Sequence, residues 1–254
     1  MKKLIVSGDS CSDINFESIC HPTWDFSYPK WPELVAKELD MKPVCLGKGG
    51  QGNDYIYSTI QDEIMKTPKE EIGMVIAGWT QCHRKDYQNG YIGRWSALRV
   101  DQDGDLINHI RKTMRHMISF QTLCERYNLP YMHFQMGTMF ESMYKGLKPT
   151  EADIVLKKLT KDSLVPYDVI RTKEKDLEKM SDIIDSYESL INNHVNWPFS
   201  AEFGGNNMLD IIFNSPNMKE LMVSELDDHP NEKGHKVLAD ELIKRMEKHG
   251  INNI

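Results

Sequence analysis

The chain has 254 residues, of which 40% are hydrophobic and 27% charged, a composition typical of a soluble globular domain. Its formal net charge of −7 at pH 7 disfavours a nucleic-acid partner, because an acidic protein repels the phosphate backbone. No apolar stretch reaches the about 18 residues that a transmembrane helix needs, so we expect no membrane span.

The N-terminal apolar run, Leu4–Val6, is too short for the core of a signal peptide. The five cysteines are odd in number and show no C-x-x-C spacing, which argues against a disulfide framework or a zinc site and fits a reducing compartment. We therefore expect a cytoplasmic protein. The same sequence is compatible with release of the protein from the cell by a route that needs no signal peptide.

Short apolar runs alternate with amphipathic stretches along most of the chain, and these predict strands and helices respectively. In chain order the predicted elements are a strand at Leu4–Ser7, a helix at Trp31–Leu39, a strand at Pro43–Leu46, a helix at Asp54–Met65, a strand at Gly73–Ala77, a helix at Leu106–Tyr127, a strand at Pro130–Gln135, a weaker strand at Met208–Phe213 and a helix at Asn231–Lys248. Alternation of this kind predicts an α/β fold with a mainly parallel sheet.

The segment from about 137 to 207 interrupts this alternation and is rich in charged and aromatic residues. It predicts either an insertion or cap beside the active-site end of the sheet, or a plain pair of helices. In both cases residues 1–254 form a single domain.

The triplet Gly8-Asp9-Ser10 directly follows the first predicted strand. A serine at the carboxyl end of a parallel strand exposes its Oγ at the edge of the sheet, where its own N–H can face a developing oxyanion. The same triplet also forms ordinary turns. Ser10 is therefore a candidate nucleophile that needs a base elsewhere in the chain.

The run Asp227-Asp228-His229-Pro230-Asn231, near the C-terminus, supplies such a base. An imidazole can accept the proton of a serine while a carboxylate fixes its tautomer. Pro230 favours an extended conformation at His229, and Asn231 is a suitable N-cap for the last helix. The cap and the catalytic role are compatible, since one loop can serve both.

Together these two segments resemble the SGNH (GDSL-like) hydrolase family, and the resemblance extends over positions 8–235. It implies a flavodoxin-like three-layer α/β/α sandwich with a mainly parallel five-stranded sheet. It also implies Ser10 as nucleophile and His229 as general base. The usual D-x-x-H block is altered, because Leu226 stands three residues before the histidine. Asp227 is the predicted triad carboxylate, with Asp228 as second choice.

The two middle blocks of the family are matched less closely. Its N-x-G-x-x-G block resembles the run Gly47-Lys48-Gly49-Gly50-Gln51-Gly52, with Gly47 where an asparagine is usual. Its G-x-N-D block resembles Gly78-Trp79-Thr80-Gln81, with Thr80 in place of the asparagine that donates to the oxyanion. A threonine hydroxyl can still donate one hydrogen bond. The resemblance thus implies an oxyanion hole formed by the N–H groups of Ser10 and Gly52 and the Thr80 hydroxyl.

The implied activity is hydrolysis of an ester through an acyl-enzyme intermediate, as in an esterase, a lipase or a carbohydrate deacetylase. The implied substrates are small esters or acetylated glycans, and the chemistry requires no metal or organic cofactor. Because Gly47 and Thr80 depart from the family pattern, an inactive module that binds a glycan or a protein is the main alternative. The run 47–52 also satisfies the G-x-G-x-x-G fingerprint of dinucleotide-binding proteins, but that alternative leaves Ser10 and His229 unexplained.

Several residues near these blocks are candidates for the rim of the site. They are Trp79, Arg84, His21, Trp24 and Tyr28. Trp79 is either a stacking surface for a sugar or a core residue. His235 is expected on a helix surface, since its spacing of six from His229 is poor for a shared metal. Cys11 is expected to be a small buried residue rather than a nucleophile.

Overall fold

The computed structural model describes residues 1–82, 84–89, 94–98, 106–137, 182–187, 189–195 and 207–251. Its centre is a five-stranded sheet in the order β2-β1-β3-β6-β7, in which every neighbouring pair is parallel. The strands are β1 (Lys3–Ser7), β2 (Lys42–Cys45), β3 (Ile72–Trp79), β6 (Tyr131–Gln135) and β7 (His194–Val195). This is the doubly wound order of flavodoxin-like folds, and it confirms the predicted fold class.

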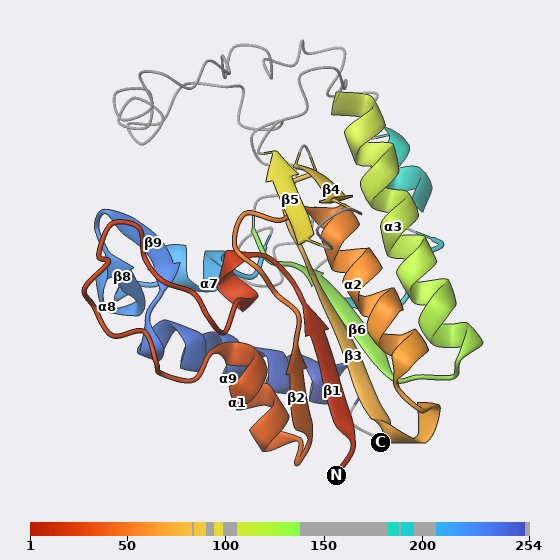
Figure 1. Ribbon diagram of the computed structural model, residues 1–254, viewed down its shortest axis with the longest axis horizontal. Helices are drawn as coiled ribbons and strands as arrows, with labels where there is room; N and C mark the ends of the chain where they lie inside the picture. The colour runs from red at the N-terminus through yellow and green to blue at the C-terminus, as the bar shows by residue number, and fades with distance from the viewer. Residues whose placement is uncertain are drawn as a thin grey trace.

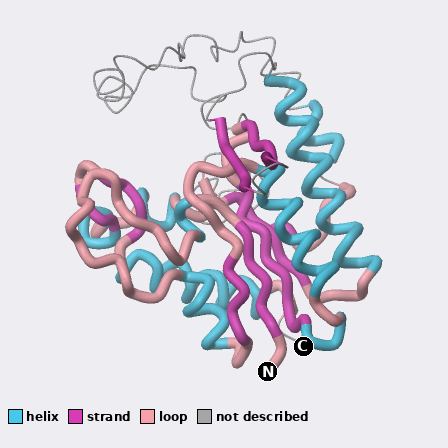
Figure 2. Tube along the Cα trace, in the orientation of Figure 1, coloured by secondary structure: helices cyan, strands magenta, loops and turns pink. Residues whose placement is uncertain are grey.

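Helices cover both faces of the sheet, which makes three layers (Figures 1 and 2). The helices α1 (Trp31–Glu38) and α9 (Glu232–Lys248) lie on one face, and α2 (Asn53–Lys66) and α3 (Leu106–Arg126) lie on the other. Successive side chains of a strand point to opposite faces of the sheet. Leu4 and Val6 therefore pack in the first layer and Ile5 in the second.

Smaller elements surround this core. They are the 3-10 helices η1 (Ser10–Ser12) and η2 (Lys69–Glu71), the hairpin of β4 (Lys85–Asn89) and β5 (Arg94–Leu98), the short helices α7 (Asp210–Phe213) and α8 (Met218–Leu221), and the hairpin of β8 (Met222–Ser224) and β9 (Asp227–Pro230). Residues 182–187 are also helical. No helix in the described ranges has both the length and the apolar character needed to cross a bilayer.

The prediction of a strand at Met208–Phe213 is wrong, because this segment is a turn followed by α7. In a strand, Met208, Asp210 and Ile212 would share one face, which would place a carboxylate in the core. The helical turn instead buries Met208 and Ile212 together and leaves Asp210 to accept hydrogen bonds from Asn207. The fifth strand of the sheet is β7.

Most of the segment 137–207, predicted as an insertion, cap or helical pair, lies outside the described residues. The described parts, 182–187 and 189–195, include a helical stretch and β7, which pairs with β6. His194 and Val195 of this segment therefore belong to the sheet.

Candidate active site

The turn after β1 presents Ser10 at the carboxyl edge of the sheet. Asp9 caps η1, and its Oδ1 accepts a hydrogen bond of 3.1 Å from the N–H of Cys11. A Cβ on Gly8 would lie 2.3 Å from the Oγ of Ser12, so this tight turn requires a glycine at that position. Gly8 and Asp9 therefore stabilise the turn that carries Ser10.

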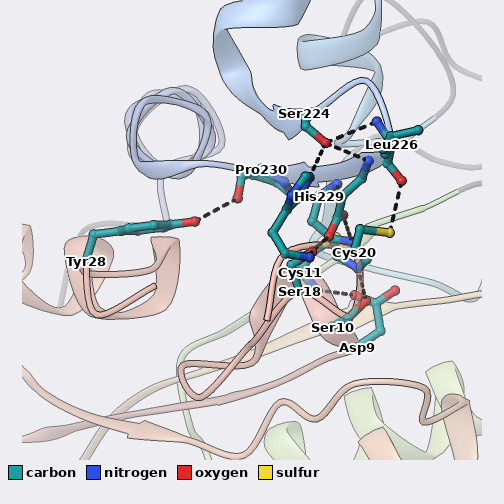
Figure 3. Close-up of polar contacts among 12 residues, drawn as sticks. Asp9, Ser10, Cys11, Ser18, Cys20, Tyr28, Ser224, Leu226, His229 and Pro230 are labelled. Carbon is teal, nitrogen blue, oxygen red and sulfur yellow. Dashed lines mark hydrogen bonds and ion pairs between the residues drawn. The ribbon is translucent and has the colours of Figure 1, made fainter. Parts of the chain in front are cut away.

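The structure brings Ser10, His229 and Asp227 together across the fold. The Nε2 of His229 lies 2.8 Å from the Oγ of Ser10 (Figure 3). The Nδ1 of His229 lies 2.6 Å from the Oδ1 of Asp227. His229 lies in the extended β9 strand before Pro230, as predicted. Asn231 caps α9, its Oδ1 accepting from the N–H of Gly234 at 3.1 Å.

This geometry assigns a role to each nitrogen of the imidazole. With Nδ1–H donating to Asp227, the lone pair of Nε2 is left to accept the proton of the Ser10 hydroxyl. The order of the contacts is the one that a Ser-His-Asp triad requires.

Charges around His229 favour its protonated form. Burial lowers the pKa of His229, but the hydrogen bond and charge of Asp227, with the charges of Asp228 and Asp9, outweigh burial and raise it above its ordinary value. Burial opposes ionisation of Asp227, yet donors from His229 and Ser18 hold the pKa of this carboxyl at about 2. Asp227 is therefore ionised throughout the pH range in which His229 titrates.

The neighbouring carboxylate, Asp228, is exposed, and the Nδ1 of His229 bonds to Asp227 instead. Ligand atoms of Asp227, Asp228 and His229 lie within 4.8 Å of one another, which is close enough for a shared metal ion. However, the nitrogens of His229 face Asp227 and Ser10, so the arrangement fits proton transfer better than metal binding.

The prediction that His235 lies on a helix surface is wrong. His235 is buried in α9, and its Nδ1 accepts a hydrogen bond of 3.3 Å from the N–H of Trp31. Burial lowers the pKa of His235 to about 3. It therefore acts as a neutral core residue that joins α9 to the start of α1.

The N–H of Gly52, in the glycine-rich run after β2, is engaged by a carboxylate, and its predicted role stays a prediction. The N–H of Gly52, predicted as an oxyanion donor, donates to both carboxylate oxygens of Asp86, at 2.7 and 2.9 Å. The N–H of Tyr55 also donates to Asp86, at 2.9 Å. The carboxylate thus caps the N-terminus of α2, the place where the dinucleotide alternative would put a pyrophosphate.

Two other glycines of this run lie closer to the turn that carries Ser10. A Cβ on Gly49 would lie 3.8 Å from the Cβ of Ser10. A Cβ on Gly47 would lie 2.4 Å from the carbonyl oxygen of Ser12. This close approach requires a glycine at position 47, because any side chain there would displace the turn.

Thr80 is also engaged by a carboxylate. Its hydroxyl donates to the Oδ2 of Asp9 at 2.8 Å, and its backbone N–H and C=O pair with the side chain of Asn53 at 2.8 and 3.0 Å. The side chain is buried, with 1% of its surface exposed. The structure therefore places the Thr80 hydroxyl toward Asp9, and its predicted role at the oxyanion stays a prediction.

Thr80→Val should reduce stability more than catalysis. The substitution keeps the shape but removes the Thr80 donor from the Oδ2 of the buried Asp9 carboxylate, which we expect to cost about 1–3 kcal/mol of unfolding free energy. Denaturant unfolding measures this cost. With an ester substrate, kcat should stay within about tenfold of the wild-type value, whereas a loss of about 10²–10³-fold would support the oxyanion role.

The candidate rim residues divide into core and surface. Trp79 is fully buried, and its Nε1 donates to the Nδ1 of His133 at 3.0 Å, so it is a core residue and offers no stacking surface. Arg84 donates to the backbone of Gln51 at 3.0 Å and lies 3.9 Å from Asp9.

His21, Trp24 and Tyr28 belong to the loop that follows η1. The rings of His21 and Trp24 stack at 3.9 Å, and the hydroxyl of Tyr28 donates to the carbonyl of Pro230 at 3.5 Å. The same loop supplies two contacts that no motif indicated. The ring of Phe16 lies 4.4 Å from that of His229, and the hydroxyl of Ser18 donates to Asp227.

Two solved structures, EstA and TesA, have the same fold. The psychrotrophic esterase EstA from Pseudoalteromonas sp. is 11% identical and gives a TM-score of 0.50 over 98% of each chain. TesA is 11% identical and gives a TM-score of 0.50 over 97% of this chain and 99% of that chain. A member of the lipolytic protein G-D-S-L family from Veillonella parvula DSM 2008 is 11% identical, with a TM-score of 0.49 over 96% of this chain and 97% of that one. No family model and no curated protein matches the sequence.

Proposed function

We propose that this chain, which shares the fold of EstA and TesA, is a serine ester hydrolase that works through an acyl-enzyme intermediate. Ser10 is the nucleophile, His229 the general base and then acid, and Asp227 the carboxylate that orients His229. The observation that carries the proposal is the line of hydrogen bonds from Asp227 through His229 to Ser10, at 2.6 and 2.8 Å.

These contacts support the following reaction. The Nε2 of His229 takes the Ser10 proton while Oγ attacks the ester carbonyl, and the resulting imidazolium is stabilised by Asp227. His229 then gives that proton to the leaving alcohol, which breaks the ester bond and leaves Ser10 acylated. A water molecule, deprotonated by His229, attacks the acyl group. The acid is released and the Ser10 hydroxyl is restored.

The N–H of Ser10 is the oxyanion donor that we propose first, because it belongs to the nucleophile itself. The other two predicted donors, Gly52 and Thr80, would have to leave Asp86 and Asp9 to serve.

Three carboxylates act on His229: Asp9, Asp227 and Asp228. They disfavour an anionic acyl group near Ser10, so we propose neutral substrates such as small esters or the acetyl esters of glycans.

Labelling by a serine-reactive phosphonate tests the proposal. We expect one adduct, located at Ser10 by mass spectrometry, and hydrolysis of short p-nitrophenyl esters by the unlabelled protein. Because only neutral His229 accepts the Ser10 proton, the labelling rate should rise with pH through the raised pKa of His229 and be lost below it. An adduct elsewhere, or a rate independent of pH, would contradict the proposed roles.

One observation favours a second candidate, an inactive module that binds a glycan or a protein. Both predicted oxyanion donors outside Ser10 are held by carboxylates, Gly52 by Asp86 and Thr80 by Asp9. If the wild-type protein shows neither esterase activity nor labelling, this candidate replaces the hydrolase.

A further inference from the structure

The loop between η1 and α1, residues 13–30, packs against the β8–β9 hairpin that carries the proposed base (Figure 3). The thiol of Cys20 donates to the carbonyl of Leu226 at 3.3 Å, and the Nε2 of His21 lies 2.6 Å from the Oγ of Ser224. Residues more than 200 positions apart in sequence are thereby held side by side.

Ser18 is the residue of this loop that reaches the proposed triad. Its hydroxyl donates to the Oδ2 of Asp227, the oxygen that His229 does not use. The contact is enclosed, since Ser18 is 1% exposed and Asp227 is 8% exposed. The N–H of His21 donates to the Ser18 oxygen at 3.2 Å, which leaves the Ser18 proton to point at the carboxylate.

The two oxygens of Asp227 therefore have separate partners. Oδ1 accepts from the Nδ1 of His229 at 2.6 Å and from its backbone N–H at 3.1 Å, while Oδ2 accepts from Ser18. A carboxylate held at both oxygens cannot rotate about its Cβ–Cγ bond without breaking one of these contacts. Ser18 thus keeps Oδ1 directed at the imidazole.

We propose that Ser18 is a positioning residue of the triad, acting through Asp227 on the orientation and basicity of His229. The inference rests on the proposed function and assigns to the loop a role beyond anchoring the hairpin. Ser18 contacts the carboxylate and not Ser10, so its effect reaches the reacting atoms through Asp227 and His229 in turn.

The pH behaviour of His229 depends on all the groups that face it. Asp227 and Asp228 lie on its own strand, Asp9 lies on the nucleophile turn, His235 on α9 also acts on it, and the Phe16 ring covers it. Loss of the Ser18 donor would concentrate negative charge on Asp227 while the other groups stay in place. Asp227 would then hold the imidazolium more strongly and raise the pKa of His229.

Ser18→Ala tests the proposal, with His21→Ala as the matched control. Both variants remove one loop-to-hairpin contact, but only Ser18→Ala removes a donor to the carboxylate. With p-nitrophenyl acetate we expect Ser18→Ala to lower kcat by about 10–100-fold, the effect of losing one hydrogen bond to a charged group, with KM nearly unchanged. The acidic limb of kcat/KM should move to higher pH, and Ser18→Thr should restore both.

An NMR titration of the His229 ring separates this proposal from the proposed function, because it requires no activity. We expect the pKa of His229 to rise in Ser18→Ala and to be unchanged in His21→Ala. An unmoved or lowered pKa, or equal effects of the two substitutions, would overturn the role of Ser18 even in an active enzyme. The protein could instead show the expected pKa shift of His229 and yet neither hydrolyse esters nor react with a phosphonate. That result would overturn the proposed hydrolase function but support the effect of Ser18 on His229 through Asp227.

Discussion

Ser10→Ala is expected to lower kcat for p-nitrophenyl acetate by about 10⁶-fold, the loss found when the nucleophile of such a triad is removed. The His229 imidazole then has no hydroxyl to deprotonate, and the acyl-enzyme cannot form. Residual hydrolysis should show no burst of p-nitrophenol and no phosphonate adduct. Stopped-flow measurement of the burst and mass spectrometry of the labelled protein check both expectations.

Cys11→Ala is the matched control, since Cys11 carries a thiol directly beside Ser10 on the same turn. Its thiol is buried, and burial, together with the charge of Asp9, raises its pKa, so it stays protonated and unreactive. We expect this variant to keep kcat within a few fold of wild type. Full activity in Ser10→Ala combined with its loss in Cys11→Ala would transfer the nucleophile to the thiol.

Asp227→Asn is expected to lower kcat by about 10⁴-fold while the fold stays intact. The carboxylate accepts from His229 at Oδ1 and from Ser18 at Oδ2. An amide has only one oxygen, so it cannot accept from both. If its oxygen stays with Ser18, its NH₂ group faces Nδ1 and forces the proton to Nε2, where it blocks transfer from Ser10. Steady-state kinetics and circular dichroism test the two parts of this prediction.

Asp228→Asn is the control, because it removes a carboxylate charge near His229 without removing the hydrogen bond to Nδ1. Asp228 is exposed and raises the pKa of His229 through its charge, after the larger effect of Asp227. We expect a loss of less than about tenfold, with the acidic limb displaced slightly to lower pH. If Asp228→Asn proves the more damaging change, the triad carboxylate is Asp228, and the serine mechanism survives.

The sheet could be predicted where its strands are long and buried. All eight residues of β3 are buried, so its apolar run is evident in the sequence. β7 has only two residues, His194 and Val195, and nothing in their composition marks a strand. The run Met208–Phe213 is apolar enough for a strand. A helical turn forms there instead, and it keeps Asp210 out of the core.

The site residues that depend on local sequence could also be predicted. Ser10 follows from a strand and a turn, and His229 follows from its place ahead of a capped helix. The hydrogen-bond partners of Gly52 and Thr80 could not be predicted from the sequence, because only tertiary packing brings Asp86 and Asp9 to them. Ser18 lacks any motif, and only the fold brings it to Asp227.

The hydrogen bond between Ser10 and His229 joins residues 219 positions apart. During synthesis Ser10 leaves the ribosome 219 residues before His229 does. Until β9 is complete and its hairpin is seated against the loop at 13–30, the serine is an ordinary alcohol with no group to deprotonate it. Under the proposed function, a chain that stalls before that point has no esterase activity, even when its first strands have formed.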